Sequence, residues 1–416
     1  MVKGKITSLA VKDVRFPTSL GHHGSDAMHT DPDYSAAYVV IETDADDALK
    51  GYGLTFTLGK GTEIVVCAVN ALSHLVVGRN LEDIVTNFRD FYRQLTSDGQ
   101  LRWPLWKLLV DMTPEQLVSC IDFRYITDVL TEAQALEILQ NGKQRQETRE
   151  ERMLKSGYPA YTTSCAWLGY SDEQLQKLCA DALQDGWTRF KVKVGADLQD
   201  DIRRCKLIRD MIGHDNKLML DANQRWDVNE AISWVQELAA FKPLWIEEPT
   251  SPDDILGHGT ISKALAPLGI GVATGEQCHN RVMFKQFLQA RALQYLQIDS
   301  CRLGSVNENL SVLLMAKKFN IPVCPHAGGV GLCELVQHLI IFDYISVSGE
   351  LDNRMCEYVD HLHEHFKYPV TIHNAAYMPP MDPGYSTEMK EDSVLSYQFP
   401  GGSVWQQLIH DKRVEI

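Results

Sequence analysis

The sequence predicts an α/β fold, a modified (β/α)8 barrel of the TIM type that carries an N-terminal α+β capping domain. The main observation is a series of short apolar runs, each closed by a residue able to take part in chemistry, at intervals of 23 to 29 residues. A strand, a helix and their two loops need about that many residues. The closing residues are Lys193, Asp221, Glu247, Glu276, Asp299 and His326. Such a barrel builds its active site at the carboxyl ends of its strands, so these side chains are expected to converge there.

The first of these runs, residues 189–195, is a short strand with a glycine at its exit. Lys191 and Lys193 are two residues apart, so their side chains point to the same face. Two neighbouring ammonium groups lower each other's pKa, which would make Lys193 a usable base near neutral pH. The alternative is an exposed edge strand with a solvated lysine face.

Length and composition limit the class of protein. The chain has 416 residues, 44% of them hydrophobic, and a formal net charge of −15. It has no run of about 18 apolar residues, so no membrane-spanning segment is predicted, and its negative charge argues against nonspecific nucleic-acid binding. The ten cysteines are scattered without a Cys-x-x-Cys pair, which suits a reducing compartment.

The N-terminal part, residues 1–115, is predicted to be the capping domain. It is expected to contain three strands and two helices, at residues 6–14, 38–43, 51–57, 62–77 and 81–95, with Asn80 as the cap of the second helix. The loop at residues 21–34 is rich in Gly, His and Asp. It is either a solvated surface loop or a lid over the barrel mouth.

The barrel domain is predicted to span residues 116–374. A strand is expected at 117–125, a charged helical region at 132–155 and the first barrel strand at 161–167. Helices then alternate with the apolar runs, at residues 172–185, 200–212, 228–241, 262–268, 280–290 and 306–319. An irregular tail, residues 375–416, is expected to fold back over the cap and the barrel.

Three carboxylates close successive predicted strands: Asp221, Glu247 and Glu276. If they converge they repel each other, and a hard divalent cation relieves this repulsion. An all-oxygen set with room for water suits Mg2+. Asn223 and Glu248 could add hydrogen bonds or a ligand. The alternative is that each acid is a rim charge in its own ion pair.

Lys193 and His326 are expected to face each other across the mouth of the barrel. Asp299, on the strand next to His326, would orient the imidazole and raise its basicity. A lone histidine is more often structural, so it is the position of His326 that argues for a role. A metal ion with a base on each side suits removal of a proton α to a carboxylate, with Lys191 helping to stabilise the enediolate. An acid on the other face then returns the proton or expels a β-hydroxyl.

Several motifs surround these residues: Lys191-x-Lys193, Asp-Ala-Asn-Gln-x-Trp from Asp221, Trp-Ile-Glu-Glu-Pro from Trp245, Ala-Thr-Gly-Glu to Glu276, Gln-Ile-Asp to Asp299, and Pro-His to His326. Together they resemble the mandelate racemase branch of the enolase superfamily. Within that branch, four further segments are similar to L-fuconate dehydratases: Gly-Ser-Asp-Ala from Gly24, Pro-Asp-Tyr-Ser-Ala-Ala-Tyr from Pro32, Cys-His-Asn-Arg from Cys278, and Cys-Glu-Tyr-Val-Asp-His-Leu from Cys356.

The resemblance implies Mg2+-dependent dehydration of a sugar acid, with L-fuconate favoured, to a 2-keto-3-deoxy acid. It implies that Lys193 is the α-proton base and that Lys191 is its electrostatic partner. His326, paired with Asp299, would be the acid that helps the 3-hydroxyl depart. The implied Mg2+ ligands are Asp221, Glu247 and Glu276. The residues expected to bind the substrate are Gly24, Ser25, Asp26, Tyr34, Lys191, Asn223 and Glu357, the last as a further acid or hydrogen-bond donor.

One departure from the family pattern lies in the cap. Trp103 runs directly into Pro104, where the family has a further cap helix, so the sequence lacks roughly one loop and one long helix. Such a helix covers apolar surface on cap and barrel, and its loss would cost several kcal/mol. Two alternatives stand beside the L-fuconate hypothesis. One is a racemase or a dehydratase of another sugar acid, and the other is an impaired isoform with a regulatory or binding role.

Other expectations concern partners and compartment. The expected partner is a small sugar acid, with no nucleic acid and no membrane, and a homo-oligomer is possible. The resemblance implies a mitochondrial location. The mildly basic N-terminus supports this only weakly, because residues 6–14 read better as a strand, so a cytoplasmic location stays open.

Overall fold

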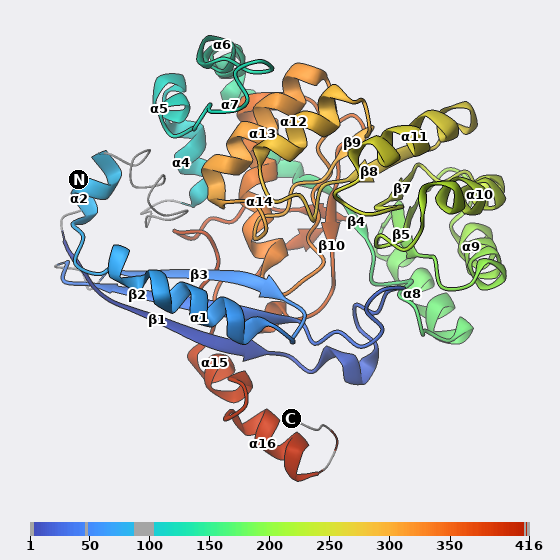
Figure 1. Ribbon diagram of the computed structural model, residues 1–416, viewed down its shortest axis with the longest axis horizontal. Helices are drawn as coiled ribbons and strands as arrows, with labels where there is room; N and C mark the ends of the chain where they lie inside the picture. The colour runs from blue at the N-terminus through green and yellow to red at the C-terminus, as the bar shows by residue number, and fades with distance from the viewer. Residues whose placement is uncertain (1–3, 46–48, 87–103, 412, 414–416) are drawn as a thin grey trace.

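The computed structural model describes residues 4–45, 49–86, 104–411 and 413. A three-stranded antiparallel sheet lies beside a barrel of parallel strands that is surrounded by helices (Figure 1). This arrangement confirms the predicted fold class, a modified barrel with an α+β cap.

The cap is built on the sheet β1-β2-β3, formed by Ile6–Arg15, Ser35–Thr43 and Lys50–Thr57. Helix α1 (Thr62–Leu72) packs against β1 and β2. Helix α2 (Leu81–Thr86) begins directly after Asn80, as predicted. The rest of that predicted helix, to residue 95, lies outside the described residues, and so does the chain that precedes Pro104 at the shortened junction.

Four helices connect the cap to the barrel: α4 (Leu105–Asp111), α5 (Pro114–Ser119), α6 (Glu132–Lys143) and α7 (Gln146–Ser156). The predicted charged helical region is therefore a pair of helices. The strand predicted at 117–125 is wrong. Thr113 and Gln116 form a capping box and Pro114 occupies the first helical turn, so a helix begins where a strand was expected.

Six parallel strands lie side by side in chain order: β4 (Tyr158–Thr162), β5 (Arg189–Lys193), β6 (Lys217–Asp221), β7 (Trp245–Glu247), β8 (Gly271–Thr274) and β9 (Tyr295–Leu296). Leu296 then bridges to Val323. The N–H of Glu357 donates to the Pro325 carbonyl (3.2 Å), and β10 (Cys356–Tyr358) pairs with β4. These contacts close the barrel.

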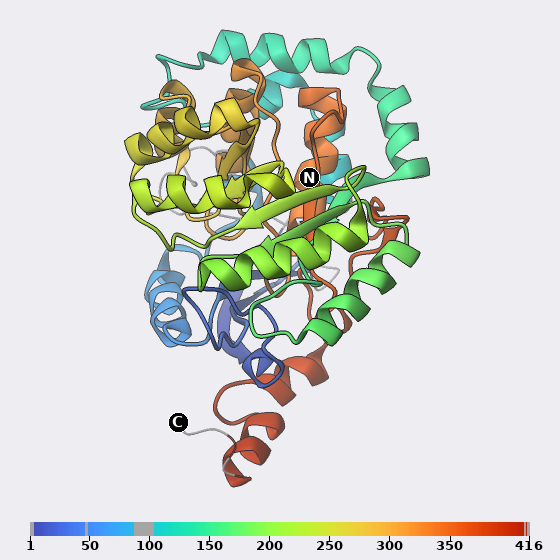
Figure 2. The same ribbon diagram turned by 90° about the vertical axis from the view of Figure 1, so that its right-hand side faces the viewer.

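Helices cover the outside of the barrel (Figure 2): α8 (Asp172–Gln184), α9 (Leu198–Ile212), α10 (Val228–Leu238), α11 (Ile255–Leu265), α12 (Arg281–Gln289), α13 (Ser305–Phe319) and α14 (Leu332–Phe342). Helix α14 continues into a π-helical segment, Asp343–Ser348. Ser171 caps α8 by accepting from the Gln174 N–H. The strands beneath these helices are buried on both faces, which explains their continuous apolar runs.

The C-terminal tail is more regular than predicted. Strands β11 (Ile372–His373) and β12 (Ala376–Tyr377) form a hairpin on the start of β4, at the amino end of the barrel. Helices α15 (Glu391–Tyr397) and α16 (Ser403–His410) lie beyond the cap sheet (Figure 1). The Trp405 indole N–H donates to the Arg15 carbonyl (3.0 Å). This hydrogen bond holds the tail on β1. The boundaries of the three predicted regions, 1–115, 116–374 and 375–416, remain predictions.

Two general expectations can be compared with the structure. All ten cysteines are free. Among the described residues, no helix has both the length and the apolar character needed to cross a bilayer.

Candidate functional site

The residues predicted to form the site lie at the carboxyl ends of barrel strands. Lys193, the last residue of β5, is paired with Asp221, the last residue of β6, and Asp221 is paired with Glu247, the last residue of β7. Residues paired across parallel strands share a face, so these three side chains lie at one end of the barrel. Glu276 and Asp299 follow the ends of β8 and β9. His326 follows the strand position of Val323.

Lys191 lies at the centre of the buried acids. Its Nζ is 2.7 Å from Glu247 Oε1, 2.7 Å from Glu357 Oε1 and 3.2 Å from Asp221 Oδ2. Burial lowers the pKa of Lys191, but the charges of Glu247 and Glu357 outweigh it and raise the pKa well above its usual range. Lys191 is therefore a fixed positive charge, as expected of an electrostatic partner.

Lys193 departs from the expectation of a lowered pKa. Its Nζ donates to Asp221 Oδ2 (2.7 Å) and to Asn223 Oδ1 (2.8 Å). Burial and the charge of Lys191 both lower the pKa of Lys193, but the charge of Asp221 outweighs them and the pKa is raised. The prediction was wrong because it counted the neighbouring lysine and not the carboxylate across the strand pair.

His326 and Asp299 form the predicted pair. The imidazole Nδ1 is 2.8 Å from Asp299 Oδ2, and Nε2 is 3.4 Å from Glu276 Oε2 and 3.7 Å from Glu357 Oε2. Burial lowers the pKa of His326, but the surrounding carboxylates, Glu276 first, outweigh it and raise the pKa to about 8. The carboxylates around His326 thus favour its protonated form, which is the form able to act as an acid.

Glu357 lies between the two sides of the site. Its Oε1 is paired with Lys191, and its Oε2 accepts from the Ala327 N–H (3.0 Å). Burial raises the pKa of Glu357, but the charges of Lys191 and His326 outweigh it and lower the pKa. The carboxyl group accepts hydrogen bonds in this arrangement, and its expected role as an acid or donor stays a prediction.

The acids at the ends of β6 to β8 are incompletely neutralised. Burial and Asp221 raise the pKa of Glu247 to about 8. Burial and Glu276 raise the pKa of Glu248, whose Oε1 atom is buried and has no hydrogen-bond partner among the described residues. Within the described chain no three acidic, histidine or cysteine side chains are placed to hold a metal ion. The donors nevertheless fit Mg2+ in kind, because they are carboxylate oxygens with excess negative charge.

The backbone beside these acids is strained. Asn223, Gln224 and Glu248 have φ values of 45°, 66° and 42°, in the left-handed region. The Gln224 amide donates to Glu248 Oε2, and the Asn223 N–H donates to Asp221 Oδ1 (3.0 Å). Strain of this kind concentrates at functional sites, because surrounding contacts must maintain it.

The cap loop supplies the remaining predicted residues, and all four are buried: Gly24, Ser25, Asp26 and Tyr34. Gly24 has φ +82°, and a Cβ atom there would collide with the Tyr34 phenol, so only glycine fits. The Leu168 N–H, from the loop after β4, donates to the Ser25 carbonyl (3.3 Å). These four residues face the barrel, whereas residues 21–23 and 28–31 of the same loop are exposed, so the loop is covered on one side and solvated on the other.

Arg302 was missed by the sequence reasoning. Its Nη1 is 3.3 Å from Glu276 Oε1 and 3.3 Å from Asp299 Oδ2, and its guanidinium carbon is 5.8 Å from the centre of the Phe56 ring on β3. Arg302 therefore joins a proposed metal ligand, the aspartate of the His326 pair and the cap. The only sequence signal is its place three residues after Asp299, in the loop that follows a strand end.

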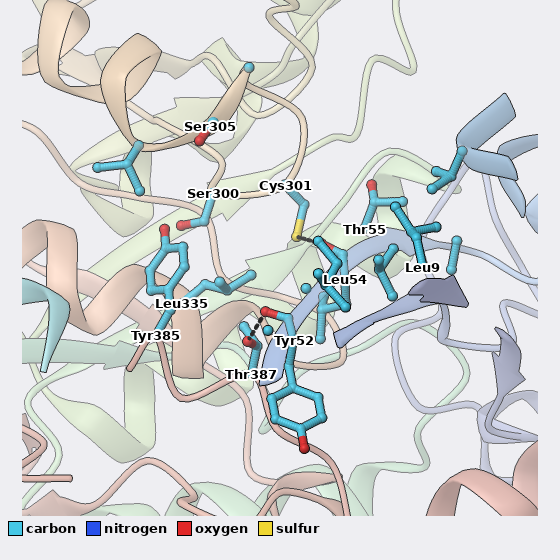
Figure 3. Close-up of a pocket in the computed structure, with 18 of the residues that line it drawn as sticks. Leu9, Tyr52, Leu54, Thr55, Ser300, Cys301, Ser305, Leu335, Tyr385 and Thr387 are labelled. Atoms are coloured by element: carbon cyan, nitrogen blue, oxygen red, sulfur yellow. Dashed lines mark hydrogen bonds between the residues drawn. The ribbon is translucent and has the colours of Figure 1, made fainter. Parts of the chain in front are cut away.

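A cavity of about 430 Å³ separates the cap sheet from the barrel (Figure 3). Its walls come from β1 to β3, α1, the loop from Ser300 to Ser305, Leu335 of α14 and the tail near Tyr385. Most of the lining residues are apolar, and none is one of the predicted metal ligands. Two hydrogen bonds cross the wall, from Thr387 Oγ1 to the Tyr52 carbonyl (2.9 Å) and from Cys301 Sγ to the Leu54 carbonyl (3.7 Å).

Comparison with known proteins identifies the family. Residues 174–393 match the family described as enolase C-terminal domain-like. Mitochondrial enolase superfamily member 1 of Xenopus laevis is 78% identical over 445 aligned positions, which cover 100% of both chains. The chain belongs to the enolase superfamily. The crystal structure of the human mitochondrial enolase superfamily member 1 has 73% identity and a TM-score of 0.96, covering 98% of this chain and 99% of that chain.

Two further comparisons are informative. L-galactonate dehydratase of Hypocrea jecorina is 47% identical, with 95% of this chain and 94% of that protein covered. The crystal structure of a racemase from Streptomyces coelicolor, described with bound magnesium, is 23% identical with a TM-score of 0.68, covering 94% of this chain and 99% of that chain. The second comparison establishes a shared fold.

The comparison with the Xenopus relative also measures the shortening. The alignment of 445 positions covers all 416 residues, so 29 of its positions have no residue in this chain. That number agrees with the predicted loss of one loop and one long helix. The position of the loss, before Pro104, remains a prediction.

Proposed function

We propose that this protein dehydrates a sugar acid, L-fuconate by preference, to a 2-keto-3-deoxy acid with Mg2+ as cofactor. The observation that carries the proposal is that the fixed charge of Lys191 and the proton donor His326 meet at one buried carboxylate, Glu357. Lys191 contacts Glu357 Oε1 at 2.7 Å, and His326 Nε2 is 3.7 Å from Glu357 Oε2. The relative named L-galactonate dehydratase supports the substrate class, because L-fuconate is L-galactonate without the 6-hydroxyl.

The residues that would hold Mg2+ are Asp221, Glu247 and Glu276. The bound ion would supply positive charge that draws in the substrate carboxylate and makes its α-proton more acidic. This function of the acids also accounts for the raised pKa of Glu247 and Glu248, which reports excess negative charge in a buried place.

Lys193 removes the proton from C2 of the sugar acid, and the electron pair of that C–H bond passes into an enediolate. The fixed charge of Lys191 stabilises this enediolate. Lys193 can accept a proton only as a free amine. The pKa of Lys193 is raised because Lys193 is paired with the charge of Asp221. Lys193 would therefore work as a base when the charge of Asp221 is balanced by the bound cation.

His326 completes the reaction from the other side of the site. The enediolate collapses, the C3–O bond breaks, and His326 gives its proton to the departing hydroxyl, which leaves as water. Asp299 holds the ring through Nδ1 and so presents Nε2–H to the substrate. The enol that remains becomes the 2-keto group after it takes up a proton at C3.

One specific observation favours a second candidate function. The chain lacks 29 positions that the Xenopus relative has, which supports an impaired isoform with a regulatory or binding role.

The relatives named mitochondrial support a mitochondrial location for this chain, which fractionation of cells that express it would test.

The proposal is tested by following L-fuconate with Mg2+ in D2O by NMR. We expect the wild type to release water and form the 2-keto-3-deoxy acid. Lys193→Ala should stop exchange of the α-proton, and His326→Asn should retain exchange but lose dehydration. Exchange without water loss in the wild type would favour a racemase. No reaction from folded, Mg2+-binding protein would favour the impaired isoform.

A further inference from the structure

Rings from three separate parts of the chain meet at His361, which follows β10. The imidazole lies 5.2 Å from the Trp167 ring, 5.4 Å from the Tyr34 ring and 5.7 Å from the His23 ring, measured between ring centres. Trp167 belongs to the loop after β4, and the other two belong to the cap loop. We call these four residues the His361 cluster. It lies where the cap loop meets the mouth of the barrel.

The polar atoms of His361 are buried without a hydrogen-bond partner. Neither Nδ1 nor Nε2 has such a partner among the described residues, and the one charged contact of the ring is the ion pair between Nδ1 and Asp360 Oδ1 at 3.8 Å, which leaves Nε2 free of it. A neutral imidazole carries one donor and one acceptor, and leaving both unpaired in a buried place is costly. His23 differs, because its Nδ1 is 3.0 Å from the Tyr170 hydroxyl.

Tyr34 connects the His361 cluster to the reacting centre. Burial raises the pKa of the Tyr34 hydroxyl, and the charges of Lys193 and Glu357 both act on it. The hydroxyl group also lies against Gly24 of the cap loop. His361 is thus one side chain away from the groups proposed to hold C1 to C3 of the substrate.

We propose that His361 binds the hydroxyl groups at the far end of the sugar acid, beyond C4, and that the His361 cluster is the subsite that recognises chain length. The inference rests on the proposed function. With C1 to C3 held at Lys191, Lys193 and His326, the remaining carbons leave the centre through the mouth, which the cap loop covers. Each sugar hydroxyl is both donor and acceptor, which matches the two nitrogens of His361. The rings of Trp167 and Tyr34 offer apolar surface to the carbon chain.

The test compares L-fuconate with a four-carbon acid that has the same configuration at C2 and C3. The variants are His361→Phe, which removes both polar atoms, and His361→Gln, which keeps a donor and an acceptor. His373→Phe is the matched control, since His373 is exposed on β11 at the opposite end of the barrel. The readout is the ratio of kcat/KM for the two acids, or the ratio of their dissociation constants by calorimetry with Mg2+ if the protein binds them without turnover.

We expect His361→Phe to lower the preference for the six-carbon acid about 10- to 100-fold, the effect of losing one or two hydrogen bonds in a buried site. The constants for the four-carbon acid should stay within about threefold, because that acid does not reach His361. His361→Gln should lose less than the Phe variant, and His373→Phe should match the wild type. The difference between the two acids is a readout that a purely structural role would not move.

Three results would overturn the proposal. If His361→Phe lowered kcat/KM equally for both acids, His361 would have a structural role only. If it lowered kcat/KM for neither acid, His361 would have no role in substrate binding. A wild type that binds neither acid would remove both the subsite and the proposed function. A wild type that binds the six-carbon acid but does not dehydrate it would refute the proposed function alone, and the ratio of dissociation constants would still decide the role of His361.

Discussion

Replacing Lys191 by methionine removes the charge at the centre of the site and keeps an unbranched side chain that is one atom shorter. Its ammonium contacts three carboxylates at 2.7, 2.7 and 3.2 Å, and none of the four side chains is more than 1% exposed. Breaking a buried ion pair by removing one partner costs about 3–5 kcal/mol, because the remaining charges stay buried without compensation. We therefore expect Lys191→Met to lose about that much free energy of unfolding, a large share of a typical total.

The assay is urea denaturation followed by circular dichroism, with and without Mg2+. Lys206→Met is the control, because Lys206 is paired with Asp210 on the exposed face of α9 and such surface pairs contribute little. We expect the deficit of Lys191→Met to shrink in excess Mg2+, since a cation bound at Asp221 and Glu247 would replace part of the lost charge. A Lys191 variant as stable as the control would refute the description of this centre.

Three more predictions follow from other parts of the structure. Glu247→Gln should abolish Mg2+-dependent turnover and weaken Mg2+ binding measured by calorimetry, and near-normal turnover would contradict the ligand assignment. Burial lowers the pKa of His338 to about 3, whereas the unfolded value is about 6.5. The neutral, buried ring therefore contributes its full share of stability above about pH 6.5. As the pH decreases from there, this contribution decreases by about 1.4 kcal/mol per pH unit. His338→Gln should lack this part of the pH dependence in denaturation experiments, and an unchanged slope would count against it. Inserting the 29 positions of the Xenopus relative should raise the free energy of unfolding by several kcal/mol, because we expect the added segment to fill the cavity between cap and barrel. If the longer chain were no more stable than this one, the cavity would not be a result of the missing positions.

The barrel could be predicted because its geometry converts a spacing along the chain into a convergence in space. Asp221 and Glu247 end paired strands, so their regular interval alone places them at one end of the barrel. The strand predicted at 117–125 failed for a local reason. Thr113 and Gln116 form a capping box that starts a helix just before the apolar residues of this segment, and a local start signal of this kind outweighs the strand propensity of the residues after it.

The electrostatics of the site could not be predicted in the same way. The chain places Lys191 next to Lys193, but the pKa of Lys193 depends on Asp221, which lies across the strand pair at 2.7 Å. Residues outside the strand ends were missed for a related reason. The positions of Arg302 and His361 depend on the conformation of the loops that follow the strands. Their ring partners belong to the cap, which is far away in the sequence.

The most direct test of the central claim is a product assay on the purified chain. The protein would be incubated with L-fuconate and Mg2+, beside L-galactonate and a panel of other sugar acids, and 2-keto-3-deoxy acids would be detected. We predict product from L-fuconate that disappears when Mg2+ is chelated. Folded protein that binds Mg2+ and forms no product from any acid would contradict the claim that this barrel is an active dehydratase.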